Sequence, residues 1–500
     1  MEVMDIVEAN SIKKQTVRAM KWSSITEILA KLISPVINML LARILSPEAF
    51  GVLATVIMVI SFAEVFVESG FQKFLIQHNF DSIEEEKRFM SVAFWANLIF
   101  SCIIWLLIII FCEDIATVAG NRGLGITIAV TGLTIPLYGI IGIQNCKLKK
   151  ELEFKGLFYV RITAAVIPLV VTLPLAIIGL DYWSLIIGNI AGVLVQSVLL
   201  VVIGKFKPDK YFSFTDLKYM LGFGIWTLLD GIATWATAWI DTLLISRYMS
   251  AYYLGLYKNS ISTITALFTM ITAALTPVLF SSLSKLQNQQ EEFNDLFSKV
   301  QRVLCTFLLP LSIGLFCYRD FATVILFGNR WLEAANIIGT MSVTIGLRTV
   351  FVSFYSDLYR AKGKFYIPLI LQIIDLAILV PTCLLAVRAG FWSLVYARAF
   401  VKLDLIIPDL IVSWYICGLS PLKTLKSLLP TFASTGVMTV VIFFLQSICS
   451  GIVWNIISIV ICVIVYFGVI LLFQSSRKEL LEPFIKKFKG NNLMKDKEWL

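Results

Sequence analysis

Several basic side chains fall inside long apolar segments, where a charge is costly to place. An ionised side chain at the centre of a membrane-spanning helix costs roughly 2.5–3.5 kcal/mol on insertion scales. Such residues persist where they face water, a partner or a bound molecule. Lysine and arginine hold phosphate oxygens well. The basic residues in these segments are Lys31, Arg161, Lys258, Arg348, Arg398 and Lys402.

Acidic side chains occupy the same segments and could bind a coupling ion such as H+ or Na+. The candidates for that role are Glu27, Asp230 and Asp241. A structural interpretation stands beside each functional one. Glu27 and Lys31 are four residues apart and could neutralise each other, and Arg348 could belong to a buried ion pair.

Aromatic residues accompany these charges in the segment 217–247. Trp235, with Trp226 and Trp239, could stack on sugar rings. Tryptophan is also frequent in the belts at membrane surfaces, which is the alternative interpretation. Arg398 and Lys402 are four residues apart and are predicted to share one helix face. Together these side chains suit an anionic, hydroxyl-rich molecule.

The segments that must position these residues are long enough to cross a membrane. Of the 500 residues, 58% are hydrophobic and only 15% are charged, whereas soluble domains are about a quarter charged. The apolar residues recur in runs of about 20, the length that a helix needs to span the hydrocarbon core. We predict an all-α integral membrane protein with about fourteen spans, at 22–43, 50–69, 89–112, 124–145, 156–179, 183–204, 217–247, 251–282, 299–318, 334–358, 365–387, 392–416, 427–449 and 452–473.

The distribution of lysine and arginine predicts the orientation. Of 42 basic residues, 30 lie in the N-terminal tail, every second loop and the C-terminal tail, and 6 lie in the opposite loops. Basic residues are retained on the cytoplasmic side. Both termini are therefore predicted to be cytoplasmic. The net charge of +9 follows from this bias, so we expect no nucleic-acid partner.

Polar residues repeat between the two halves of the chain. Segments 22–43 and 217–247 each carry five polar residues spaced 3, 4, 3, 4, which places each set on one helix face. The two sets, 203 positions apart, are Ser24, Glu27, Lys31, Ser34 and Asn38, and Thr227, Asp230, Thr234, Thr237 and Asp241. Beyond them, Arg43, Ser46 and Gly51 recur as Arg247, Ser250 and Gly255 at an offset of 204.

This repeat predicts two six-helix bundles related by a pseudo-twofold axis along the membrane normal, because an even number of helices separates the copies. Polar stripes that enclose a hydrated central cavity would explain the pattern, and stripes that only join helices are the alternative. The predicted parts are a cytoplasmic N-terminal tail (1–21), the first bundle (22–204), a cytoplasmic linker (205–216), the second bundle (217–416), two further helices (427–473) and a cytoplasmic C-terminal tail (474–500).

No motif for catalysis or cofactor binding is evident. The chain has no G-x-x-x-x-G-K-[ST] phosphate-binding loop, and its one histidine, His78, has no second metal ligand nearby in sequence. The nine cysteines form no C-x-x-C pair and are interpreted as small buried hydrophobic residues. We therefore expect no enzyme activity, no cofactor and no metal site.

Three segments resemble the bacterial polysaccharide flippase family, the O-antigen, capsule and teichuronic-acid translocases of the multidrug/oligosaccharidyl-lipid/polysaccharide exporter superfamily. They are NMLLARILSPEAFGVLATVIMVISF, ESGFQKFLIQHN and KLKKELEF. The resemblance implies a fourteen-helix flippase of the bacterial inner membrane. Such a protein would move an undecaprenyl-pyrophosphate-linked oligosaccharide between leaflets by alternating access, for surface polysaccharides such as lipopolysaccharide.

The resemblance further implies that basic residues engage the pyrophosphate, which by position points to Lys31, Lys258, Arg348, Arg398 and Lys402. Membrane lipid and perhaps a polymerase or glycosyltransferase of the same pathway would be its partners. Two alternatives stay open. One is a cation-coupled small-molecule (multidrug) antiporter of the same superfamily, and the other is a lipid II flippase.

Overall fold

The computed structural model describes most of the chain between residues 35 and 473. The described residues are 35–67, 70–78, 80–273, 276–364 and 366–473, with residues 22, 26, 29 and 33. Every regular element among them is a helix, and no strand occurs in these residues. The predicted all-α fold is confirmed.

The helices divide into two compact units, each made of two stretches of the chain. Unit 1 comprises 1–274 and 369–401, and unit 2 comprises 275–368 and 402–500. This division groups helices by their contacts, whereas the predicted bundles follow the sequence repeat, so the repeat-based boundaries stay a prediction.

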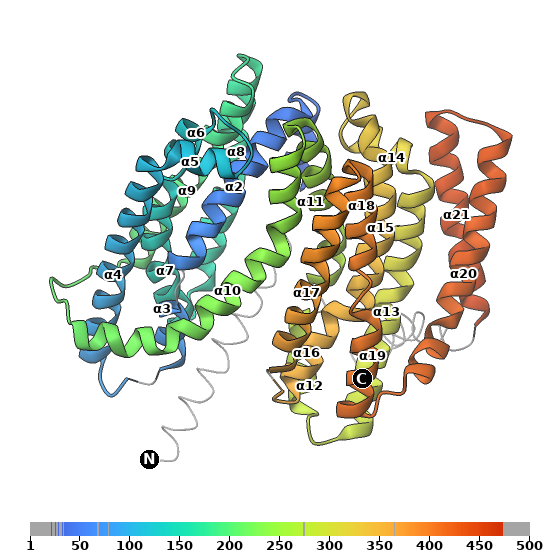
Figure 1. The fold of residues 1–500 in the computed structure, drawn as a ribbon. Coiled ribbons are helices and arrows are strands. Elements are labelled where there is room, and N and C mark those ends of the chain that lie inside the picture. The colour runs from blue at the N-terminus through green and yellow to red at the C-terminus, as the bar shows by residue number, and fades with distance from the viewer. Residues whose placement is uncertain are drawn as a thin grey trace, which may run out of the picture. The chain divides into compact units, whose positions relative to one another are not determined.

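Unit 1 contains the helices of the first half of the chain together with two later ones (Figure 1). Its longest contact runs between the antiparallel helices α8 and α9, and α2 packs extensively on α11. The helices are α2 (Pro47–Val67), α3 (Phe71–Gln77), α4 (Ile83–Ile110), α5 (Cys112–Val118), α6 (Gly125–Thr131), α7 (Thr134–Lys150), α8 (Phe154–Ile177), α9 (Tyr182–Gly204), α10 (Phe214–Tyr248), α11 (Ala251–Ala273), most of α17 (Tyr366–Arg388) and α18 (Phe391–Val401).

Unit 2 is built around α13, which packs on α15 and α20, while α20 also packs on α21. A π-helical segment, η2, interrupts the helix that follows α15. The elements are α12 (Thr276–Lys285), α13 (Gln290–Cys317), α14 (Arg319–Leu326), η1 (Asn329–Ala334), α15 (Ala335–Arg348), η2 (Thr349–Ser353), α16 (Phe354–Ala361), α19 (Ile406–Cys417), α20 (Pro421–Ile448) and α21 (Ile452–Leu472).

Local sequence explains where several helices begin. Ser82 caps α4 by accepting a hydrogen bond from the Glu85 backbone N–H at 3.1 Å, and the Glu85 carboxylate accepts one from the Asp81 N–H at 2.8 Å. This reciprocal pair satisfies backbone donors that the first turn leaves free. Ser213 accepts a hydrogen bond from the Asp216 N–H at the start of α10 in the same manner.

Eleven helical segments of the described residues are long and apolar enough to cross a membrane. They agree with eleven of the predicted spans. The other three are 22–43, which lies mostly outside the described residues, and 251–282 and 392–416, which the structure describes as α11 with α12 and α18 with α19. The count of fourteen therefore stays a prediction.

The last two helices carry the longest exposed apolar surfaces of unit 2. One side of α20 and α21 packs in a core that includes Met438, Ile442 and Tyr466. The other side exposes residues such as Phe444 and Val453, at 65% and 70% of their surface. A lipid-facing surface has this apolar character.

Candidate functional site

A buried ion pair joins α10 to α18 in unit 1. Arg398 Nε lies 2.9 Å from Asp241 Oδ2, and the two side chains are only 7% and 6% exposed. Arg398 Nη2 also donates to the Thr237 carbonyl at 2.9 Å. Asp375 of α17 is buried and attracts Arg398 electrostatically. A charge pair so removed from water is stable only when its other hydrogen-bonding groups are also satisfied.

The Asp241 carboxylate meets that condition. Oδ2 accepts from Arg398 and from the Tyr257 hydroxyl at 2.7 Å. Oδ1 accepts from the Thr242 backbone N–H at 2.6 Å and from its hydroxyl at 3.1 Å. Four donors thus match the four lone-pair sites of a carboxylate. A proton or Na+ can therefore bind Asp241 only if at least one of these donors leaves.

Lys258 extends this cluster by one hydrogen bond. Its Nζ donates to the Thr242 hydroxyl and to the Ala238 carbonyl, both at 3.3 Å, and lies 3.6 Å from the centre of the Trp239 ring. Hydrogen bonds of this length are weak, and the aromatic face attracts the cation. Lys258 therefore holds its charge with partners that an incoming phosphate could displace.

The polar stripe predicted on 217–247 contacts neighbouring helices along part of its length. The Thr234 hydroxyl accepts from Gln372 of α17 at 3.0 Å, and Thr237 and Asp241 bind Arg398 of α18. Asp230, from the same stripe, is exposed. The described contacts show that the stripe joins helices, and they leave its predicted cavity as a prediction.

In unit 2, Arg348 lies at the last position of α15, directly before the π-helical segment η2. Its Nη1 lies 3.6 Å from Asp404 Oδ1 and 3.3 Å from the Lys402 carbonyl oxygen. Arg348 is 23% exposed, in contrast to the 7% of Arg398. Both arginines thus contact one carboxylate and one backbone carbonyl of their own unit.

The predicted helix face shared by Arg398 and Lys402 is wrong. The α-helix ends at Val401, and residues 402–405 form a turn before α19 begins at Ile406. The fourfold spacing therefore no longer places the two side chains on one face. Arg398 belongs to unit 1 and Lys402 to unit 2.

Trp235 has a structural role that the sequence did not reveal. Its indole N–H points to α2, where the Met58 carbonyl and the Ser61 hydroxyl lie at 3.3 and 3.2 Å. Its ring packs on Phe62 with 4.7 Å between ring centres. The other two predicted site residues, Glu27 and Lys31, lie outside the described residues.

A second buried polar cluster surrounds η2 in unit 2 and was not predicted. The Tyr359 hydroxyl donates to Asp409 Oδ1 at 3.0 Å, and Gln301 donates to the Tyr355 hydroxyl and to the Val350 carbonyl, both at 3.2 Å. A π-helical turn leaves a carbonyl without its usual partner, and such turns are frequent at functional sites. No spacing in the sequence indicates this turn.

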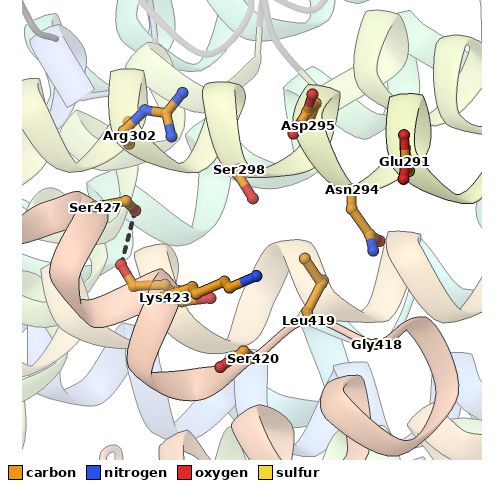
Figure 2. A pocket seen from close by; sticks show the side chains of 11 residues that line it. Glu291, Asn294, Asp295, Ser298, Arg302, Gly418, Leu419, Ser420, Lys423 and Ser427 are labelled. Carbon is orange, nitrogen blue, oxygen red and sulfur yellow. Dashed lines mark hydrogen bonds between the residues drawn. The ribbon is translucent and has the colours of Figure 1, made fainter.

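A hydrophilic pocket of about 490 Å³ lies between the start of α13 and the residues around the start of α20 in unit 2 (Figure 2). Figure 2 shows Arg302 and Asp295 on one side and Lys423 on the other. Its charged lining residues are two acidic and two basic side chains, Glu291, Asp295, Arg302 and Lys423. None of the predicted site residues lines it, and the topology predicts that it opens to the cytoplasm.

These observations define a multi-pass α-helical membrane protein with ion pairs inside its membrane helices, an arrangement typical of membrane transport proteins. A family model described as "Polysaccharide biosynthesis protein" matches residues 40–336. This match covers more than half of the chain, which therefore belongs to that family.

Curated relatives are similar over most of the chain. An "Uncharacterized membrane protein in cps region" of Klebsiella pneumoniae is 24% identical over 374 residues, 74% of this chain and 76% of that protein. The "Lipopolysaccharide biosynthesis protein WzxC" of Escherichia coli is 23% identical over 346 residues, 68% and 69% of the two chains. The family resemblance seen in the sequence is confirmed.

Among solved structures, the fold is similar to the lipid II flippase MurJ in an inward closed conformation. The TM-score is 0.74, the sequence identity is 17%, and the match covers 91% of this chain and 98% of that one. At this identity the match establishes the fold alone.

Proposed function

We propose that this protein is a flippase that moves an undecaprenyl-pyrophosphate-linked oligosaccharide across the bacterial inner membrane by alternating access, for export of a surface polysaccharide. The observation that carries the proposal is the family match over residues 40–336. The names of the relatives point to capsule regions and lipopolysaccharide. A carrier of finished repeat units is the membrane step that such pathways require.

The charge cluster of unit 1 supports a phosphate-bearing cargo. Moving a sugar–phosphate head group through hydrocarbon would strip its hydrogen bonds, at several kcal/mol for each unsatisfied group. Lys258, with its long hydrogen bonds, and Arg398 offer replacement donors. The pyrophosphate would compete with Asp241 for Arg398. Lys31, Arg348 and Lys402 remain further proposed ligands.

An ion gradient, H+ or Na+, is proposed to drive the cycle through Asp241, Asp230 or Glu27. Release of Asp241 from Arg398 would let the carboxylate bind an ion as the phosphate binds the guanidinium. Ion binding and cargo binding would then be linked through one side chain. The chain is proposed to act as a carrier with cytoplasmic termini and not as an enzyme, in company with polymerases or glycosyltransferases of its pathway.

The test is a deletion strain of the source bacterium, complemented with the wild-type gene or with variants. The flippase predicts that lipid-linked repeat units accumulate on the cytoplasmic face while drug sensitivity stays normal. Accumulation of lipid II would instead identify a lipid II flippase. Altered drug sensitivity without any accumulated lipid-linked glycan would identify an antiporter and refute the proposal.

Variants of the charge cluster separate a role in transport from a general need for basic residues. Arg398→Gln and Lys258→Gln are expected to lose complementation while remaining inserted in the membrane. The matched control is Arg388→Gln, which changes an exposed arginine at the end of α17 in the same unit. Complementation by Arg398→Gln and Lys258→Gln at the control level would remove the cluster from the mechanism.

A further inference from the structure

Two equivalent glycines of the sequence repeat contact each other's helices in unit 1. A Cβ atom on Gly51 of α2 would lie 1.9 Å from the Ala251 carbonyl oxygen, and a Cβ on Gly255 of α11 would lie 1.8 Å from the Pro47 carbonyl oxygen. Both distances are far below any real contact, so only glycine fits at either position.

The two contacts exchange under the repeat. Gly51 and Gly255 are 204 positions apart, and so are Pro47 and Ala251. Each glycine therefore contacts the repeat equivalent of the residue that contacts the other glycine. This reciprocity is the property of a twofold-symmetric interface. The crossing of α2 and α11 therefore lies on the local axis that relates the two repeats.

A buried polar cluster lies beside this crossing. The Asn121 side-chain amide donates to the Thr55 hydroxyl at 3.1 Å and to the Ser246 hydroxyl at 2.8 Å, and these two hydroxyl oxygens are 3.0 Å apart. Thr55 and Ser246 are 0% and 1% exposed. The cluster thus connects α2, the loop after α5 and the end of α10.

We propose that this crossing and the polar cluster form a latch that closes the outer end of the transport pathway and opens once in each cycle. The lysine and arginine distribution predicts that the start of α2, Asn121 and the start of α11 all lie on the outer side. The latch rests on the proposed function, because an alternating-access carrier must separate its outer helix ends.

The chemistry of the latch suits repeated opening. Glycine backbones meet without interlocking side chains, so few packed groups must be extracted when the helices part. The hydroxyl and amide groups of the polar cluster can exchange their mutual hydrogen bonds for water when it enters. Closing then requires only the expulsion of that water.

The first test measures opening without any transport assay. In a variant without native cysteines, Ser246→Cys is exposed to a membrane-impermeant maleimide in whole cells. Gly51→Ala or Gly255→Ala is expected to accelerate labelling by about tenfold or more, since overpacking a close contact shifts a two-state equilibrium that far. The matched control is Gly436→Ala in α20, where a Cβ meets nothing within 4 Å. Equal labelling rates in the three alanine variants would overturn the latch.

The second test closes the latch covalently. The Thr55 and Ser246 oxygens are 3.0 Å apart, which suits a disulfide between cysteines at these positions. Oxidised Thr55→Cys/Ser246→Cys is expected to lose nearly all glycan export and to regain it on reduction. The control pair is Thr306→Cys/Thr431→Cys in unit 2, whose oxygens are 3.5 Å apart. Full export by the oxidised latch pair would refute the proposal.

The two tests separate the latch from the cargo. If the cysteine-containing parent exports no glycan in the complemented strain, the proposed function fails. The labelling rates then still decide whether the outer end opens at Gly51 and Gly255.

Discussion

Asp241→Asn removes the charge partner of Arg398 and keeps the volume of the side chain. The guanidinium is left in a site where it is 7% exposed. The new amide also offers an NH2 group where the carboxylate accepted hydrogen bonds on both oxygens. At least one of the four donors to Asp241 must then face another donor or lose its partner.

The expected cost follows from burial. Removing one partner of a buried ion pair costs about 3–5 kcal/mol, because the remaining charge is uncompensated. The double variant Asp241→Asn/Arg398→Gln removes both charges. It should be more stable than Asp241→Asn by about 1–2 kcal/mol, a typical interaction energy for residues in one network.

The control is an ion pair of nearly equal length at the surface of the same unit. Lys87 Nζ lies 2.8 Å from Asp209 Oδ1, and both side chains are 52% exposed. Exposed pairs contribute at most about 1 kcal/mol. Asp209→Asn should therefore lower the free energy of unfolding by less than that amount, although the distance is no longer than that of the buried pair.

Titration with SDS in mixed micelles, followed by the fluorescence of the 12 tryptophans, compares the free energies of unfolding. The argument from burial requires a much larger loss for Asp241→Asn than for Asp209→Asn, and partial recovery in the double variant. Equal losses in the two single variants would mean that water reaches Arg398, and the buried ion pair would then be wrong.

Three further substitutions test individual contacts. Tyr257→Phe removes one hydrogen bond to the Asp241 carboxylate and should lower the free energy of unfolding by about 1.5–3 kcal/mol in the same titration; a change below 0.5 kcal/mol on that order-of-magnitude scale would contradict the hydrogen bond. Trp235→Phe loses the indole N–H and should destabilise the protein by about 1 kcal/mol while complementation persists, whereas lost complementation at normal protein levels would favour a contact with sugar. Arg348→Ala should abolish complementation while the protein remains inserted, and full complementation would exclude its proposed role.

The positions of most helices were predictable because the apolar runs alone determine them. The segment 183–204 corresponds to α9, Tyr182–Gly204, and the segment 452–473 corresponds to α21, Ile452–Leu472. Each run has the length of one membrane crossing, and the bilayer permits only a helix there. Tertiary contacts have little influence on such boundaries.

The breaks within predicted helices could not be found in this way. The turn at 402–405 and the π-helical segment Thr349–Ser353 lie in stretches that stay largely apolar. Their neighbours carry contacts between distant residues, such as the Tyr359 hydrogen bond to Asp409. Local composition contains no information about such partners.

The candidate site was predicted by residue type and missed by partner. Both Asp241 and Arg398 were expected from the cost of a membrane charge, yet they are 157 positions apart and nothing in their spacing joins them. Tyr257, which completes the carboxylate's hydrogen bonds, carries no charge and gave no signal. Its only sequence feature is its position next to Lys258.

The pairing of the arginines bears on how a carrier could release its cargo. A phosphate bound by an unpaired buried arginine would be held too firmly to leave, because the empty site would be very unfavourable. Arg398 has Asp241 and the Thr237 carbonyl as its own acceptors, and Arg348 has Asp404 and the Lys402 carbonyl. A bound phosphate would replace these acceptors, and they would replace it in turn. The internal carboxylates therefore set the affinity as a difference between two occupied states, which is the condition for binding on one side and release on the other.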